Sequence, residues 1–142
     1  MHTGRYSYQP HLVAPLRIAG PHQPFRSSHQ LTHEKILQLI DDFAHCAQLA
    51  REAGYDGVEV MGSEGYSINE FLTLRTNQRS DQRGGDYRNR MRFAVEVVCT
   101  VRERVGNDFM MIYRLSMLRP CSKAAALFAE TKNWRRPFKR RA

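Results

Sequence analysis

The feature that most restricts the fold of this chain is a change of hydrophobic period that occurs twice. Apolar residues recur at three- and four-residue steps over residues 36–50 and 91–101, as in helices with one buried face. Short segments typical of strands follow at residues 57–61, GVEVM, and 109–113, FMMIY. The second run is apolar throughout, which is typical of a strand buried on both faces. The order helix, strand, helix, strand predicts an α/β fold with two adjacent, parallel strands.

Capping residues predict where the two helices begin and end. Thr32 is the expected N-cap and Gly54 the expected C-cap of the first helix, and the second runs from about Tyr87 to Val105, with Gly106 and Asn107 as its stop. The residues expected on the buried face of the second helix are Met91, Val95, Val98 and Val101. Residues 1–30 contain four prolines and are expected to be loop-like.

The distribution of charge restricts the class of partner. The chain has 142 residues and a formal net charge of +8. Residues 1–118 hold 14 basic and 13 acidic residues, whereas residues 119–142 hold 8 basic residues and one acidic residue. A nucleic-acid-binding fold would spread its basic charge over the domain itself, so the near-neutral body argues against nucleic acid as its partner.

Several other classes of protein are excluded by the composition. No stretch approaches the roughly 18 consecutive apolar residues of a membrane-spanning helix, and the first ten residues lack the apolar core of a signal peptide. Cys46, Cys99 and Cys121 are an odd number at wide spacing, which excludes a disulfide framework and a CxxC metal site. Cys46 and Cys99 fall on predicted helices as small core residues. We expect a cytoplasmic protein with no membrane partner and no metal.

The connection after the first strand, residues 62–86, is the expected location of chemistry. It is much longer than most such loops, contains a small helical stretch near residues 69–74, and follows the carboxyl end of a parallel strand. It places Glu64 two residues before Tyr66. A phenol is neutral at pH 7 and can donate a proton, and Glu64 could orient it. On residue chemistry alone, a loop aromatic and a solvated charge explain the pair better.

Arginines in the same region allow two interpretations. Arg75, Arg79 and Arg83 could hold anionic oxygens of a ligand, or they could pair with Glu70, Asp81 and Asp86 and fix the loop. Pairing is the better explanation for most of them. Arg114 ends the second strand, where a buried charge needs a partner. That partner is a cofactor or a buried carboxylate.

Several motifs in this region resemble the flavin-dependent old yellow enzyme family. Residues 53–98 read AGYDGVEVMGSEGYSINEFLTLRTNQRSDQRGGDYRNRMRFAVEVV. The family patterns are G-[FY]-D-G-V-E-[IV], H-G-A-H-G-Y-L, T-N-x-R-x-D-x-x-G-G and N-R-x-R-F, and the opening HTGRYSY is also similar. The usual H-x-x-H pair is replaced by Met61 and Glu64, as in the flavin domain of bacterial 2,4-dienoyl-CoA reductases, which this chain resembles most within the family.

The resemblance implies a TIM barrel with FMN at the carboxyl ends of its strands. It implies reduction of a conjugated C=C bond in an enoyl or dienoyl thioester by flavin hydride, with Tyr66 as proton donor and Glu64 as the acidic residue beside it. Arg75 matches a substrate-contacting arginine, and Arg114 matches the arginine that meets the flavin ring. The NADPH, FAD and 4Fe-4S sites of such reductases belong to parts that this sequence does not contain.

The departures from the family pattern define the expected extent of the fold. The resemblance covers about residues 2–118, which supply a barrel from the end of strand three to strand five. Residues 119–142 diverge apart from FAET, which predicts an irregular basic tail that is disordered or frameshifted. Arg83 stands where the family usually has an aromatic residue. We expect the isolated segment to bind FMN poorly and to be inactive. The alternative is a non-catalytic polypeptide that binds nucleic acid through its tail, or a degenerate gene end without a partner.

Overall fold

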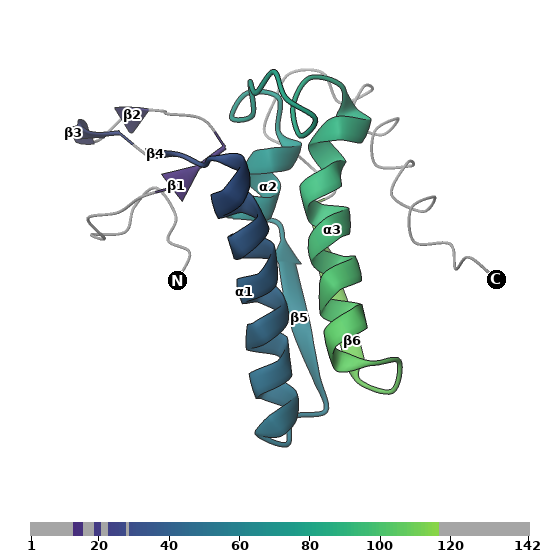
Figure 1. The fold of residues 1–142 in the computed structure, drawn as a ribbon. Helices are drawn as coiled ribbons and strands as arrows, with labels where there is room; N and C mark the ends of the chain where they lie inside the picture. The colour runs from purple at the N-terminus through teal and green to yellow at the C-terminus, as the bar shows by residue number, and fades with distance from the viewer. Residues whose placement is uncertain (1–12, 16–18, 21–22, 28, 117–142) are drawn as a thin grey trace.

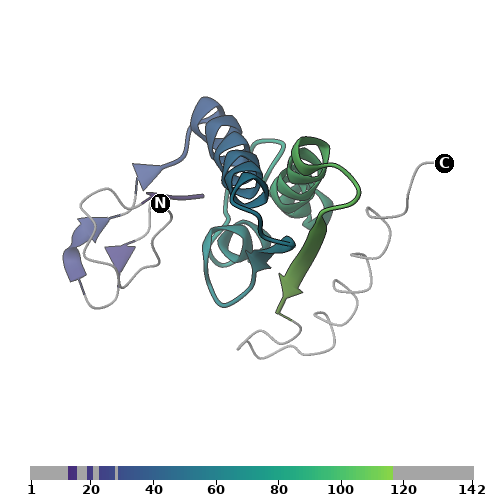
Figure 2. The ribbon, with the colours of Figure 1, turned by 90° about the horizontal axis from the view of Figure 1, so that it is seen from below.

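The computed structural model describes residues 13–15, 19–20, 23–27 and 29–116 (Figure 1). Its main unit contains two long helices, α1 (His33–Glu52) and α3 (Tyr87–Val105), and two strands, β5 (Gly57–Gly62) and β6 (Met110–Leu115). Figure 2 shows both helices on the same side of the strand pair. A short helix, α2 (Ser67–Leu72), follows β5. The chain therefore alternates between strands and helices in the predicted order.

The two strands are hydrogen-bonded to each other and run in parallel. Their register extends from Gly57 opposite Met110 to Gly62 opposite Leu115. Parallel neighbours require a crossover, and α2, α3 and the loop between them provide it. The expectation of adjacent, parallel strands is confirmed. As a consequence, the carboxyl ends of β5 and β6 lie side by side, at the end where the long connection begins.

The ends of α1 follow from local hydrogen bonds. The Thr32 hydroxyl accepts a hydrogen bond from the Lys35 amide at 3.3 Å, so the predicted N-cap is confirmed. At the other end, Gly54 has a φ of +85° and its amide donates to the Arg51 carbonyl, while the Tyr55 amide donates to the Ala50 carbonyl. This is a Schellman motif with the glycine one position after the C-cap.

The second long helix also has the predicted bounds. Asp86 caps α3 by accepting a hydrogen bond from the Asn89 amide at 2.8 Å, and Gly106 ends it with a φ of +77°. The predicted buried face is only partly right, because Val95 is half-buried. The buried apolar residues of α3 are Met91, Phe93, Ala94, Val97, Val98, Val101 and Val105. The stripe toward α1 and the sheet follows the four-residue steps from Phe93 to Val105.

The core lies between the two long helices and one face of the sheet. Val60 of β5 is buried there, and Val58, Met111, Tyr113 and Leu115 pack against the cluster. The prediction that the second strand is buried on both faces is wrong. Residues of β6 alternate between exposed and half-buried, with Met110 59% and Ile112 52% exposed. No described helix covers this second face, so an apolar run here has one buried side only.

The prediction of a loop-like segment before residue 31 is wrong for part of the described chain. Strands β1 (Val13–Ala14) and β4 (His29–Gln30) pair in parallel, and β2 (Ala19–Gly20) pairs antiparallel with β3 (Gln23–Ser27). These strands are short, and Pro24 lies within β3, which is compatible with an edge strand.

The predictions for the cysteines can be checked for Cys46 and Cys99. Cys46 and Cys99 are exposed on α1 and α3, so their assignment as small core residues is wrong. Other side chains of these two helices form the core with the sheet. The predicted tail, residues 119–142, and Cys121 lie outside the described residues. Among the described helices, none is both long and apolar enough to cross a membrane.

Candidate functional site

The candidate site lies at the carboxyl ends of β5 and β6 and in the connection between β5 and α3 (Figure 1). Within the connection we distinguish a site segment, residues 64–75, from a frame segment, residues 77–83. Three predicted site residues, Glu64, Tyr66 and Arg75, belong to the site segment, and Arg114 lies on β6. The structure brings Glu64 and Arg114 into contact.

Arg114 is held by two carboxylates on the sheet face that no described helix covers. Its Nε and Nη2 atoms lie 3.0 and 3.1 Å from the two carboxylate oxygens of Glu59, and its Nη1 lies 3.3 Å from Glu64 Oε1. The expected burial of Arg114 is wrong, because its side chain is 47% exposed. The hydrogen bond to Glu59, followed by the charge of that carboxylate, raises the pKa of Arg114.

Glu64 lies in a backbone conformation that glycine normally adopts. Its φ is +61°, and Gly65 follows with a φ of +81°. The Glu64 amide donates to the Ser116 hydroxyl at 3.2 Å, and the Gly65 amide donates to Asn69 Oδ1 at 3.2 Å. A side chain in left-handed backbone costs about 1 kcal/mol or more, a cost that often marks functional segments. The tight turn directs the carboxylate of Glu64 to Arg114.

Tyr66 occupies the N-cap position of α2, where a tyrosine is an unusual residue. Its side chain makes no capping hydrogen bond, and its backbone carbonyl accepts from the Glu70 amide at 2.8 Å. Its side chain is 41% exposed. The structure places the phenol at the surface beside the Glu64 turn. Among the described residues, the ionic partner of the Glu64 carboxylate is Arg114 and no hydrogen bond joins it to Tyr66.

Arg75 lies in the turn that follows α2 and is exposed. The Thr76 hydroxyl fixes this turn by donating to the Glu70 carbonyl at 2.7 Å, and the Asn77 amide donates to the Thr73 carbonyl at 2.8 Å. The turn therefore has a defined backbone, while the guanidinium of Arg75 remains open to solvent. This arrangement suits a side chain that binds an anionic ligand.

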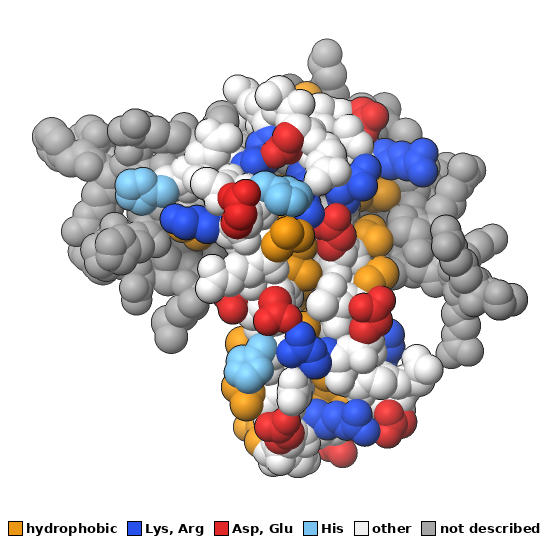
Figure 3. All heavy atoms as spheres, viewed as in Figure 1, with side chains coloured by type: hydrophobic (Ala, Val, Ile, Leu, Met, Phe, Trp, Pro, Cys, Tyr) orange, Lys and Arg blue, Asp and Glu red, His pale blue; other side chains and the backbone are white. Residues whose placement is uncertain are grey.

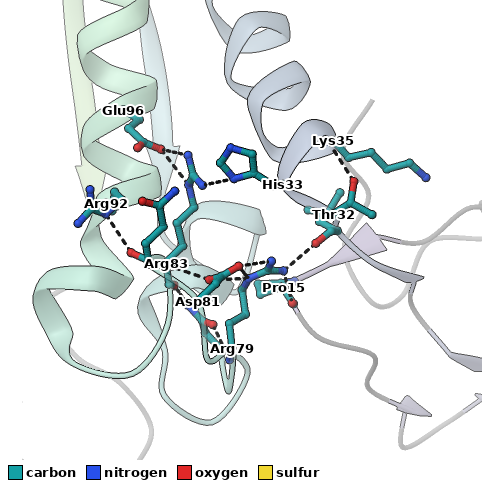
Figure 4. Close-up of polar contacts among 12 residues, drawn as sticks. Pro15, Thr32, His33, Lys35, Arg79, Asp81, Arg83, Arg92 and Glu96 are labelled. Carbon is teal, nitrogen blue, oxygen red and sulfur yellow. Dashed lines mark hydrogen bonds and ion pairs between the residues drawn. The ribbon is translucent and has the colours of Figure 1, made fainter.

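In the frame segment the side chains of Asn77, Arg79 and Arg83 are buried, and Figure 4 shows the contacts of the two arginines. Arg79 donates to the carbonyls of Pro15 and Leu31 at 2.9 and 2.7 Å, and it forms an ion pair with Asp81. The hydrogen bond from Arg79 lowers the pKa of Asp81. The predicted pairing of these arginines is right for Arg79 with Asp81. It is wrong for Asp86, which caps α3.

Sequence reasoning missed three residues at this edge. Glu59 was not considered, although it lies on the same strand face as Met61, which is opposite Arg114 in the register. A parallel register would have identified it as a diagonal neighbour of Arg114. Ser63 and Ser67 are buried, and their hydroxyls have no hydrogen-bond partner among the described residues. No sequence signal distinguishes them from ordinary loop serines.

The surface charge of the described residues is mixed rather than uniform. On the face in Figure 3, Lys and Arg side chains alternate with Asp and Glu over the helices, with apolar side chains between them. Two ion pairs join α1 to other parts of the chain, one between Asp41 and Arg104 of α3 and one between Arg51 and Asp108. This face therefore lacks the uniform basic patch of a nucleic-acid-binding surface. Within the described part of the chain, no three His, Cys, Asp or Glu residues form a metal-binding group.

Comparison with known proteins places these residues in a family context. Residues 1–135 match the family model described as NADH:flavin oxidoreductase / NADH oxidase family. The metal reductase of Desulforamulus reducens is 48% identical over 87 residues, which cover 61% of this chain and 13% of that protein.

Solved structures share the arrangement of helices and strands. The 2-naphthoyl-CoA reductase complex with 2-naphthoyl-CoA has a TM-score of 0.71 and 34% identity, over 75% of this chain and 16% of that one. The old yellow enzyme homologue from Zymomonas mobilis has a TM-score of 0.69 and 33% identity, over 75% and 32%. The described residues thus form part of a (β/α)8 barrel, as predicted. The chain spans a third or less of the length of each relative named here.

Proposed function

Because the chain belongs to the NADH:flavin oxidoreductase / NADH oxidase family, we propose that it provides the substrate-side edge of an FMN-dependent reductase. The proposed reaction is the reduction of a conjugated C=C bond in an enoyl or dienoyl thioester. The resemblance to the old yellow enzyme family is confirmed by the comparisons. Closeness to 2,4-dienoyl-CoA reductases belongs to the proposal. The observation that carries it is the contact between Arg114 and Glu64 beside the exposed phenol of Tyr66.

Arg114 has the exposure and the remaining N–H groups that contact with a flavin requires. A guanidinium has five N–H groups, and the three contacts to Glu59 and Glu64 leave two for another acceptor. Its side chain is also accessible from the open face of the sheet. In the proposed complex, Arg114 binds the ring edge that gains negative charge on reduction. The chemistry that a bound flavin supplies is hydride transfer.

Tyr66 is the proposed proton donor, acting through its phenol oxygen. The donor must be protonated at pH 7 and must reach a ligand from the surface, and an exposed phenol at the mouth of the sheet meets both requirements. Glu64 contributes through Arg114: it holds the guanidinium and neutralises part of its charge. In this proposal the position of Tyr66 depends on the Glu64–Gly65 turn that precedes it.

Arg75 is the proposed contact for the anionic part of the substrate. Like Tyr66 it is exposed, and it lies nine residues further along the site segment. A CoA thioester carries phosphate groups, and a guanidinium fork binds phosphate oxygens well. The neighbouring structure that holds 2-naphthoyl-CoA is a reductase of such a thioester by its name, which supports this substrate class for our chain.

The proposal can be tested in a chimera that supplies the remaining strands of the barrel. Residues 32–116 of this chain would replace the matching segment of the Zymomonas mobilis homologue, and reduction of a dienoyl thioester would be followed at steady state. We expect Arg75→Ala to raise KM about ten- to a hundredfold with little change in kcat, because it removes a charged contact made before and during the reaction. Gln78→Ala, a change at another exposed loop residue, should leave both constants unaltered. An unchanged KM for Arg75→Ala would contradict the proposal that Arg75 binds the anionic part of a thioester substrate.

A further inference from the structure

Arg83 is a buried cation whose guanidinium joins three elements (Figure 4). Its side chain is 2% exposed. Nε and Nη2 donate to Glu96 Oε2 of α3 at 3.0 and 2.8 Å, and Nη1 lies 3.0 Å from Nδ1 of His33, the first residue of α1. The backbone of Arg83 is fixed as well, because its amide donates to Asp81 and its carbonyl accepts from Asn77.

The contact between Arg83 and His33 determines where the imidazole proton must be. A guanidinium donates hydrogen bonds and accepts none, and it keeps its charge throughout the range in which proteins are folded. Nδ1 of His33 is therefore the acceptor, and the proton of a neutral ring is on Nε2. A doubly protonated ring would place an N–H group of one cation against an N–H group of another at 3.0 Å.

We propose that His33, Arg83 and Glu96 form a proton-sensitive latch that fastens the frame segment to α1 and α3. While His33 is neutral, Arg83 bridges both helices. When His33 takes up a proton, its contact with Arg83 becomes repulsive and the frame segment loses this contact with α1, while Arg79 keeps its hydrogen bond to the Leu31 carbonyl. The motif resemblance places an aromatic residue at the position of Arg83, and an aromatic side chain could not form this bridge. The inference does not depend on the proposed reaction.

Other charged groups on the elements around the exposed His33 have contacts of their own. Glu96 faces the cluster from α3, but its carboxylate accepts two hydrogen bonds from Arg83, so the two charges largely offset each other. On α1 itself, Glu34 is the next residue and interacts electrostatically with His33. Asp81 of the frame segment pairs with Arg79. Glu59 of β5 is paired with Arg114 on the opposite sheet face.

Nitrogen NMR and amide hydrogen exchange on the intact chain test the latch. At pH 8 we expect the His33 ring to carry its proton on Nε2 and an unprotonated Nδ1. Between pH 8 and pH 5.5, amide exchange in residues 77–84, corrected for the intrinsic effect of pH, should accelerate about tenfold. In His33→Asn, the amide oxygen takes the position of Nδ1 and accepts at every pH, so the acceleration should disappear.

Two outcomes would overturn the proposal. One is a proton on Nδ1 of His33 at pH 8, and the other is an equal pH response in the parent chain and in His33→Asn. His45→Asn is the matched control, because His45 is exposed on the same helix, and it should keep the parent response. If His33→Asn does not fold, the ring nitrogen shifts of the parent chain decide the question alone.

Discussion

The site segment and the frame segment are neighbours in one connection, yet they place the same residue type in opposite environments. Arg75, Arg79 and Arg83 are spaced four residues apart, but Arg75 is exposed whereas Arg79 and Arg83 are buried. The buried arginines bind backbone carbonyls, Asp81 and Glu96. The exposed one remains available to a ligand.

This difference distinguishes residues that stabilise the loop from residues that could contact a ligand. Buried, hydrogen-bonded polar groups are costly to disturb, whereas exposed charges contribute little to stability. Substitutions of the buried residues Asn77, Arg79 and Arg83 of the frame segment should therefore lower the free energy of unfolding. Substitutions of the exposed residues Tyr66 and Arg75 of the site segment should leave it nearly unchanged and alter ligand binding or turnover instead.

The largest loss of stability is expected for Asn77→Ala. Asn77 is fully buried, donates to the Phe71 and Arg83 carbonyls at 2.6 and 2.7 Å, and accepts from the Arg79 amide at 3.2 Å. Its removal leaves three buried polar groups unsatisfied, so we expect a loss of about 3 kcal/mol in urea unfolding of the intact chain.

The matched control for Asn77→Ala is Gln78→Ala. Gln78 is adjacent in sequence but exposed, so its substitution should change the unfolding free energy by less than about 0.5 kcal/mol. Equal effects of the two substitutions would contradict the distinction between buried and exposed polar residues in this loop.

A smaller effect, dependent on pH, is expected for Asp81→Asn. The hydrogen bond from Arg79 lowers the pKa of Asp81 below its value in the unfolded chain. The stabilisation is therefore complete above about pH 4, near the ordinary pKa of aspartate, and is lost as the pH falls further. Because the side chain is 40% exposed, we expect a loss of only about 1 kcal/mol at pH 7.

The measurement for Asp81 is the difference in unfolding free energy between pH 7 and pH 3. The parent chain should lose more stability over this range than Asp81→Asn, whose amide does not titrate. Asp42→Asn, at an exposed position of α1, should behave like the parent. Parallel acid profiles for the parent and Asp81→Asn would show that the ion pair with Arg79 does not stabilise the frame segment.

The elements of the fold could be predicted from the sequence because their signals are local. Thr32, Gly54 and Gly106 cap helices through contacts within a few residues, and the alternation of periods indicates parallel strands. The exposed face of β6 could not be predicted, because an apolar run does not reveal whether another layer covers its second side. Burial of a strand is a property of its neighbours, which lie far away in sequence.

The candidate site could be located from the sequence, but its contacts could not. The long loop after β5 identified the region of Glu64 and Tyr66. The partners of Arg114 and Arg83 depend on strand register and on packing between helices, at separations of 55 residues to Glu59 and 50 residues to His33. Such pairs can be identified only from the three-dimensional structure, because spacing in the sequence favours carboxylates that lie nearer along the chain.

The most direct test of the account is the rate at which substrate reoxidises the reduced flavin in the chimera with Tyr66→Phe. The substitution removes one hydroxyl from an exposed side chain, so stability and flavin reduction should be unchanged. We expect stopped-flow reoxidation by a dienoyl thioester to slow about 100- to 10,000-fold, the usual contribution of a general acid. Tyr55→Phe, at the opposite end of β5, should reoxidise at the parent rate. Reoxidation of Tyr66→Phe at the parent rate would contradict the assignment of Tyr66 as proton donor.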